Sequence, residues 1–187
     1  MFIKGKKVIK SYRDTKLRSI SKKLAPQASH ENYNIGVIDT ETFRSSDGTN
    51  KIYALGFKSY VNKKRTVYYI EDEYKSDDLV LKLINELLTS KYSKTIFYCH
   101  NFGGYDVIFI LKVLISYNSR CENSEKYNLS FNFRDNRILS MTIKKDRNKL
   151  EIRDSYAIFN SSLKTLSIAY GCDVHKLVRG LPLQVCN

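Results

Sequence analysis

A short apolar run that leads directly into two acidic residues is the feature that most constrains how this chain can fold. Residues 35–38 (Ile-Gly-Val-Ile) predict a buried strand, because short apolar runs are typical of strands in a sheet core. Asp39 and Glu41 follow at once, and the two-residue period of a strand places both carboxylates on one face. Burying a strand right up to a pair of charges is unfavourable unless the charges have a role there. Two neighbouring carboxylates at a strand end suit a hard divalent cation, and a solvated strand terminus is the alternative.

Hydrophobic patterns along the rest of the chain predict a mixed α/β domain. Strand-like patterns occupy residues 35–39, 52–60, 66–70, 95–99, 138–143 and 150–153. Helical patterns occupy residues 76–88, 105–116 and 163–170, the last capped by Ser161 or Ser162 and ended by Gly171. The polar residues 117–136 are expected to form an exposed connection or insertion. Hairpins followed by alternating helices and strands indicate a mixed sheet with helices covering its faces.

The charge of the chain indicates a polyanionic partner. The 187 residues include 32 Lys and Arg against 19 Asp and Glu, which gives a net charge of +13. Residues 1–30 carry +8 of this charge, which predicts a basic N-terminal arm over residues 1–32 and a mildly basic domain over residues 33–187. A solvated tail and an arm that binds nucleic acid fit such a segment equally well. No run of 18 apolar residues occurs, so we expect no membrane span.

A second candidate segment, residues 98–106 (Tyr-Cys-His-Asn-Phe-Gly-Gly-Tyr-Asp), joins a predicted strand to a predicted helix. Its glycines would let a nucleic-acid backbone approach closely. Asn101 can donate a hydrogen bond to a phosphate or a base, and Tyr105 can stack on a base or form a hydrogen bond. His100 is expected to be a packed or hydrogen-bonded histidine rather than a ligand.

The last residue of this segment, Asp106, opens the predicted helix, where a negative charge is favourable. A simple helix-start acid is therefore one interpretation. The other joins Asp106 to Asp39 and Glu41, which gives three carboxylates at the ends of adjacent strands. Enzymes that hydrolyse phosphodiesters with two metal ions are assembled in this way.

Three segments of the sequence resemble one family. Residues 35–42 and 100–106 are similar to the first and second motifs of the 3′–5′ exonuclease domain of family B DNA polymerases. The second motif is most similar to that of the protein-primed polymerases of fungal mitochondrial linear plasmids. Residues 153–156 followed by 161–166 resemble the Asp-Ser strand end and the Ser-Leu helix of the same group. The resemblance extends from about Asn34 to Pro182.

The resemblance implies an RNase H-like fold and a site that uses Mg²⁺ or Mn²⁺. It implies that Asp39, Glu41 and Asp106 are the catalytic metal ligands. It also implies that four residues hold a single-stranded 3′ end, namely Thr42, Asn101, Tyr105 and Ser155. The family's catalytic lysine is matched by Lys176 by distance and by Arg179 by local pattern, and both alternatives stay open.

The same resemblance gives expectations about partners and location. Single-stranded DNA and a terminal protein primer are the expected partners, the chain is expected to be a monomer, and a mitochondrial location is expected, with the cytoplasm as the alternative.

Two departures from the family pattern bear on activity. The third exonuclease motif, Tyr-x3-Asp, should follow this region, but no acidic residue occurs after Asp173. The polymerase motifs are also missing, so we expect the N-terminal exonuclease part of a polymerase, truncated before the third motif. One alternative is a non-catalytic remnant that binds nucleic acid. The other is a small standalone RNase H-like nuclease that completes its site with Asp154 or a partner chain.

Overall fold

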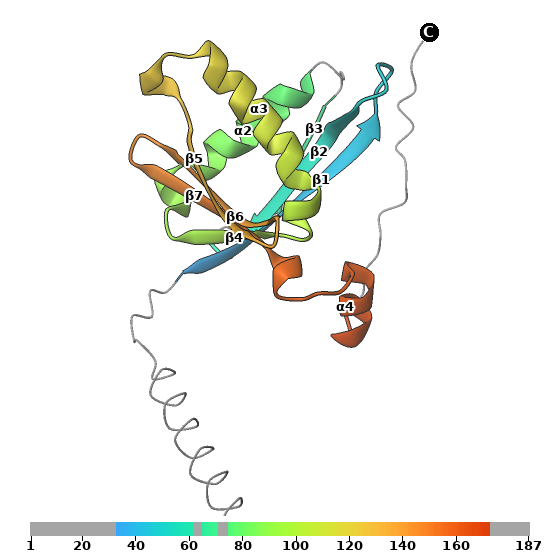
Figure 1. The fold of residues 1–187 in the computed structure, drawn as a ribbon. Helices are drawn as coiled ribbons and strands as arrows, with labels where there is room; N and C mark the ends of the chain where they lie inside the picture. Colours follow the sequence, from blue (N-terminus) through green and yellow to red (C-terminus); the bar gives the residue numbers. More distant parts are fainter. Residues whose placement is uncertain (1–32, 62–64, 71–74, 173–187) are drawn as a thin grey trace, which may run out of the picture. The chain divides into compact units, whose positions relative to one another are not determined.

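A computed structural model describes residues 33–61, 65–70 and 75–172. The chain divides into two units, Met1–Asn32 and Tyr33–Asn187, and the residues described here all belong to the second. This unit contains a seven-stranded mixed sheet in the order β3-β2-β1-β4-β7-β6-β5 (Figure 1). The predicted mixed α/β architecture is confirmed.

The strands are β1 Asn34–Arg44, β2 Asn50–Ser59, β3 Thr66–Tyr69, β4 Thr95–Cys99, β5 Asn128–Arg134, β6 Arg137–Lys145 and β7 Asn148–Asp154. The longer helices are α2 Ser76–Leu87, α3 Asp106–Arg120 and α4 Leu163–Ala169, and two short turns at the site are η3 Phe102–Gly104 and η5 Ser155–Ala157. β4 pairs in parallel with both β1 and β7, whereas the outer strands pair antiparallel. The three central strands therefore run in the same direction, and β4 and β7 end side by side at Cys99 and Asp154.

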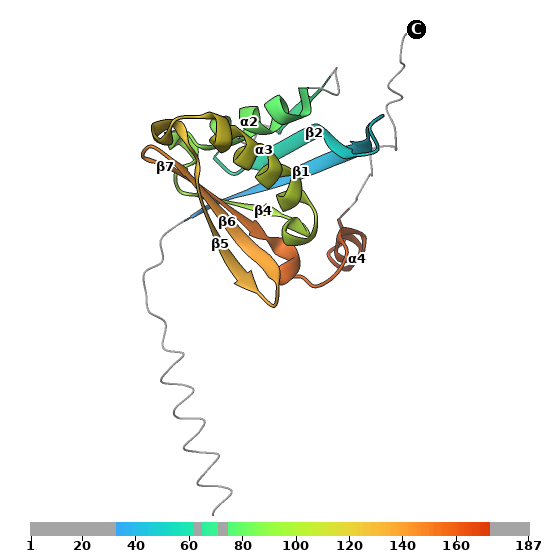
Figure 2. The same ribbon diagram turned by 45° about the horizontal axis from the view of Figure 1, so that its top comes forward.

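Helices α2 and α3 lie over the same face of the sheet (Figure 2). The predicted apolar positions of α2, Leu79, Leu83 and Leu87, are all buried, as are Ile110 and Leu114 of α3. Each fully buried side chain of this size contributes about 1.5–3 kcal/mol to folding. The packed face holds the N-terminus of α3, and with it Asp106, against the central strands.

The first strand is longer than its apolar run predicts. It continues to Arg44, so Asp39 and Glu41 lie within β1 and the prediction that they end the strand is wrong. The reason is that pairing with β2 continues through Asp39↔Gly56 to Arg44↔Asn50. Pairing with β4 stops at Val37↔Tyr98, so the acids lie beyond the end of β4 although they remain inside β1.

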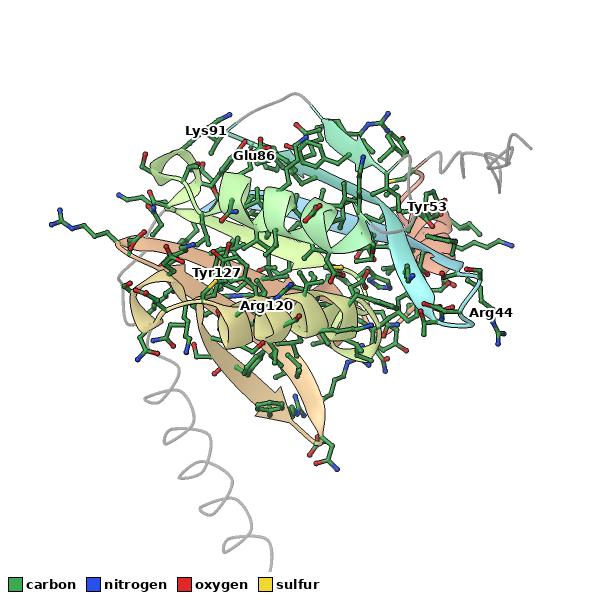
Figure 3. All side chains as sticks on the ribbon, turned by 90° about the horizontal axis from the view of Figure 1, so that it is seen from above. Arg44, Tyr53, Glu86, Lys91, Arg120 and Tyr127 are labelled. Atoms are coloured by element: carbon green, nitrogen blue, oxygen red, sulfur yellow. The ribbon has the colours of Figure 1, made fainter. Side chains whose placement is uncertain are left out.

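Most of the polar residues 117–136 are exposed, as predicted, but much of this segment is helix and strand rather than a connection. Helix α3 continues to Arg120, and β5 is a strand that pairs with β6. Tyr127, labelled in Figure 3, is buried between these elements, and its hydroxyl donates to Asn85 of α2 at 2.7 Å. The Asn118 side chain binds both the amide nitrogen and the carbonyl oxygen of Tyr127, at 2.9 and 2.8 Å. Asn118, which the sequence placed in a connection, lies in α3 and holds the chain where it enters β5.

The last helix begins and ends as the sequence predicts. Ser162, rather than Ser161, is its N-cap and accepts a hydrogen bond from the amide of Thr165 at 3.1 Å. Gly171 follows the helix with a φ of 63°, the left-handed conformation that favours glycine. Across the described ranges, no helix is both long enough and apolar enough to cross a membrane.

Candidate active site

The three predicted metal ligands come from two elements. Asp39 and Glu41 are both exposed on β1 and Thr40 between them is buried, so the same-face prediction for the two acids is confirmed. Thr40 faces Asp106 at the start of α3 and donates a hydrogen bond to its Oδ1. The Cys99 thiol at the end of β4 also donates to this carboxylate. Two donors from neighbouring strands therefore hold the buried Asp106 in place.

The carboxylates interact electrostatically. Partial desolvation raises the pKa of Asp39 even though the residue is exposed, and the negative charges of Glu41 and Asp106 raise it further. Burial also raises the pKa of Asp106, while the hydrogen bonds from Thr40 and Cys99 oppose this shift. A bound cation would relieve the repulsion between these groups, and carboxylate oxygens are the donors that Mg²⁺ and Mn²⁺ prefer. The residues present therefore fit such an ion.

The three predicted carboxylate ligands are not arranged as a complete metal site in this structure. The part of the chain that the structure describes holds no group of three or more His, Cys, Asp or Glu side chains close enough to bind a metal ion. Binding a cation to all three carboxylates therefore requires Asp39, Glu41 and Asp106 to approach one another more closely than in this structure.

Two of the four predicted DNA-binding residues are in direct contact. The hydroxyl groups of Thr42 on β1 and Tyr105 before α3 are hydrogen-bonded at 2.6 Å. The Tyr105 ring also makes an edge contact with Phe109, with ring centroids 5.1 Å apart. Tyr105 is 39% exposed, so much of the ring is accessible to a ligand next to the acids of β1.

The packing of the turn itself requires two glycines of the 98–106 segment. A Cβ on Gly103 would lie 2.1 Å from the backbone oxygen of Ile138, and one on Gly104 would lie 2.6 Å from the Oδ1 of Asn101. Asn101 itself adopts a φ of 62°. The glycines let this turn pack against β6 and fold under the Asn101 side chain.

Asp154 at the end of β7 is a structural acid. Its Oδ2 accepts hydrogen bonds from the amide of Gly103 at 3.0 Å and from the Nε and Nη2 of Arg137 at 3.1 and 2.8 Å. Its Oδ1 accepts from the amide of Tyr156 at 2.9 Å, and its side chain is fully buried. Both oxygens accept hydrogen bonds and the carboxylate is paired with Arg137, which favours a structural role for Asp154 over the hypothesis that it completes the metal site.

Arg137 is a site residue that the sequence did not predict. Besides Asp154 it binds the Oδ1 of Asn101 through Nη2 at 2.8 Å, and its guanidinium lies 4.6 Å from the ring centroid of Tyr156. The residue lies at the start of β6, one residue after a segment predicted to be a loop, and its own charge is unremarkable in so basic a chain. The buried Asp154 needs a cation, but no local pattern pairs it with Arg137.

Ser155, the last of the four predicted binding residues, lies beside His100. The Oγ of Ser155 is 3.1 Å from the Nδ1 of His100, whose ring makes an edge contact with Tyr156. His100 is thus packed and hydrogen-bonded, as predicted. Lys176 and Arg179 lie outside the described residues.

Solved structures identify the fold. A Phi29 DNA polymerase complexed with primer-template DNA and incoming nucleotides matches with a TM-score of 0.58 and 16% identity, over 81% of this chain and 26% of that chain. A Phi29 DNA polymerase complexed with single-stranded DNA matches with a TM-score of 0.57 and 14% identity, over 81% and 27%. The domain is therefore RNase H-like, and the fold prediction is confirmed.

Sequence comparison gives the family. The model of DNA polymerase type B, organellar and viral, matches residues 86–181, which is just over half of the chain. The chain therefore belongs to the type B DNA polymerases. A probable DNA polymerase of Podospora anserina is 32% identical over 78% of this chain and 16% of its own length. One of Agaricus bitorquis is 30% identical over 76% and 19%. The chain spans less than a fifth of the length of these curated relatives.

Proposed function

We propose that this domain is the 3′–5′ exonuclease part of a protein-primed family B DNA polymerase and acts on single-stranded 3′ ends during DNA replication. The observation that carries the proposal is the electrostatic coupling of Asp39, Glu41 and Asp106 beside the hydrogen-bonded pair Thr42–Tyr105. A metal-dependent reaction on DNA needs carboxylates and a nucleic-acid contact next to each other, and this site supplies both.

The proposed site gives separate roles to its carboxylates, to Thr40 and to a basic residue. Asp39, Glu41 and Asp106 are the proposed ligands of the cations, and Thr40 keeps the Asp106 carboxylate oriented. When bound, two divalent cations activate a water molecule and stabilise the leaving oxygen of a phosphodiester. The proposed assisting lysine of the family is Lys176, with Arg179 as its rival.

The proposed binding residues come from β1, from the turn before α3 and from the end of β7. Tyr105 offers a ring face for stacking and a hydroxyl for hydrogen bonding, and Thr42, Asn101 and Ser155 add polar contacts from three different segments. The net charge of +13 attracts the polyanionic strand. A terminal protein primer and a mitochondrial location belong to the proposal for the whole polymerase.

The test is degradation of a 5′-labelled single-stranded oligonucleotide by the purified chain with Mg²⁺ or Mn²⁺. We expect stepwise shortening from the 3′ end that the double variant Asp39→Ala/Glu41→Ala abolishes. Glu122→Ala/Glu125→Ala is the matched control, because it removes two exposed carboxylates that follow the C-terminal end of α3. Binding of the same oligonucleotide in EDTA should survive in all three proteins. Shortening that persists in Asp39→Ala/Glu41→Ala would contradict the assignment of the site.

A non-catalytic role in binding nucleic acid is the second candidate. It is favoured by the absence, within the described ranges, of a finished group of three metal ligands. Oligonucleotide binding without shortening in either metal would support this role over hydrolysis by the chain alone.

A further inference from the structure

The side chain of Asn101 is held in one orientation by Arg137. The Nη2 of Arg137 lies 2.8 Å from the amide oxygen of Asn101. Since a guanidinium has only donors, the atom that faces it must be the oxygen of the amide and not its nitrogen. The NH₂ end of Asn101 is thereby turned away from Arg137, with two donors to offer.

Arg137 is itself fixed on two further sides. Its Nε and Nη2 both bind the fully buried Asp154, at 3.1 and 2.8 Å, and its guanidinium lies over the Tyr156 ring. Separating a buried carboxylate from its partner strongly destabilises the folded protein. The pair between Asp154 and Arg137 therefore keeps the guanidinium in one position. The same carboxylate accepts from the amide of Gly103, which ties the turn that carries Asn101 to the same anchor.

We propose that Arg137 is a positioning residue that makes Asn101 an obligate hydrogen-bond donor toward the nucleic acid. The group bound there is then an acceptor, either a phosphate oxygen or the carbonyl oxygen of a base. This inference rests on the proposed function and deepens it, because it states which side donates the hydrogen bond in one contact with single-stranded DNA.

The experiment measures binding of a short 5′-fluorescein oligothymidylate to the full chain in EDTA by fluorescence anisotropy. Arg137→Lys keeps a cation beside Asp154 but lacks the planar fork that reaches both Asp154 and Asn101. We expect it to weaken binding by about tenfold, the effect of losing one well-oriented hydrogen bond to a charged group. Arg134→Lys, on the same hairpin and 76% exposed, is the matched control and should bind like the wild type.

A double-mutant cycle separates positioning from a direct contact. Asn101→Gly removes the side chain and keeps the positive φ, which glycine adopts without strain. If Arg137 acts through Asn101, Arg137→Lys causes no further loss of affinity in the Asn101→Gly background. Losses that add would show that Arg137 acts independently and would overturn the inference.

A second variant covers the case in which Arg137→Lys does not fold. Asn101→Asp keeps an acceptor for Arg137 but replaces the two donors by an oxygen. We expect it to bind the oligothymidylate more weakly than Asn101→Gly does, and equal or tighter binding would contradict the donor role. A wild-type chain that binds no oligothymidylate would overturn the proposed function and this inference with it, whereas binding that is unaffected by all three variants would overturn the inference alone.

Discussion

At the scale of single residues, two acids that look alike in the sequence have opposite roles. Asp154 is buried and satisfied by four donor groups, whereas Asp39 is exposed and repelled by its neighbours. Asp39 follows an apolar run and Asp154 follows the alternating segment Leu-Glu-Ile-Arg, but the sequence predicted a strand end at both, so sequence pattern did not separate their roles. The difference is made by Arg137, which the fold brings to Asp154 from 17 positions earlier in the chain.

This contrast predicts opposite effects on stability. Asp154→Ala leaves Arg137 without its buried partner, and we expect the free energy of unfolding to fall by about 3–5 kcal/mol. Urea denaturation followed by circular dichroism measures this directly. Glu41→Ala, which truncates an exposed acid on β1, is the comparison and should change the free energy of unfolding by less than about 1 kcal/mol. A small effect of Asp154→Ala would show that the Arg137 network contributes little to folding.

The raised pKa of Asp39 predicts a pH dependence with a definite sign. A carboxyl group whose pKa is higher in the folded than in the unfolded state binds more protons when folded, so stability falls as the pH rises through that range. Glu41→Gln removes one of the charges responsible. We expect this variant to raise the midpoint of thermal unfolding at neutral pH by an amount corresponding to less than about 1 kcal/mol. The gain should vanish below the usual aspartate pKa, and a gain that persists at acidic pH would contradict this cause.

At the scale of elements, the sequence predicted β4, α2 and α4 well, because each has a clear apolar pattern or a cap. The sequence did not predict β5. The apolar residues Leu129 and Phe131 alternate with Asn and Ser there and are only partly buried, so the hydrophobic pattern of the strand is weak. The sequence prediction also ended β1 too early, because the pairing of residues 39–44 depends on β2 and not on local hydrophobicity. The site shows the same limit, since contacts between distant segments such as Arg137–Asn101 leave no local pattern.

The turn between β4 and α3 gives a prediction at this scale. Gly103→Ala would place a methyl group 2.1 Å from the Ile138 backbone oxygen, so the turn must move away from β6. We expect a loss of about 1–3 kcal/mol of stability and weaker oligonucleotide binding, since Asn101 lies on the same turn. Gly56→Ala in β2 is the control, because a methyl group there has its nearest neighbours at 3.6 Å. Equal stability of the two variants in thermal unfolding would show that the turn tolerates a side chain.

At the scale of the whole molecule, the question is where the charge that attracts DNA resides. Residues 1–30 hold +8 of the net +13, but the candidate site lies in the second unit of the chain. An arm that contacts phosphates would raise the affinity without adding sequence information, because such contacts act through the release of counterions. A solvated tail would add only a weak long-range attraction.

Salt dependence distinguishes these two cases. For single-stranded DNA, the slope of log affinity against log salt concentration is about −0.7 for each phosphate neutralised. If the arm contacts DNA, Lys6→Gln/Lys7→Gln should make this slope shallower by about 1.4 in anisotropy titrations at several salt concentrations. The control Lys91→Gln/Lys94→Gln removes the same charge from exposed positions near the start of β4, away from the acids of β1, and should leave the slope unchanged. Equal slopes for both variants would mean that Lys6 and Lys7 make no phosphate contact, and binding would then rest on the strand-end site around Tyr105 and Asn101.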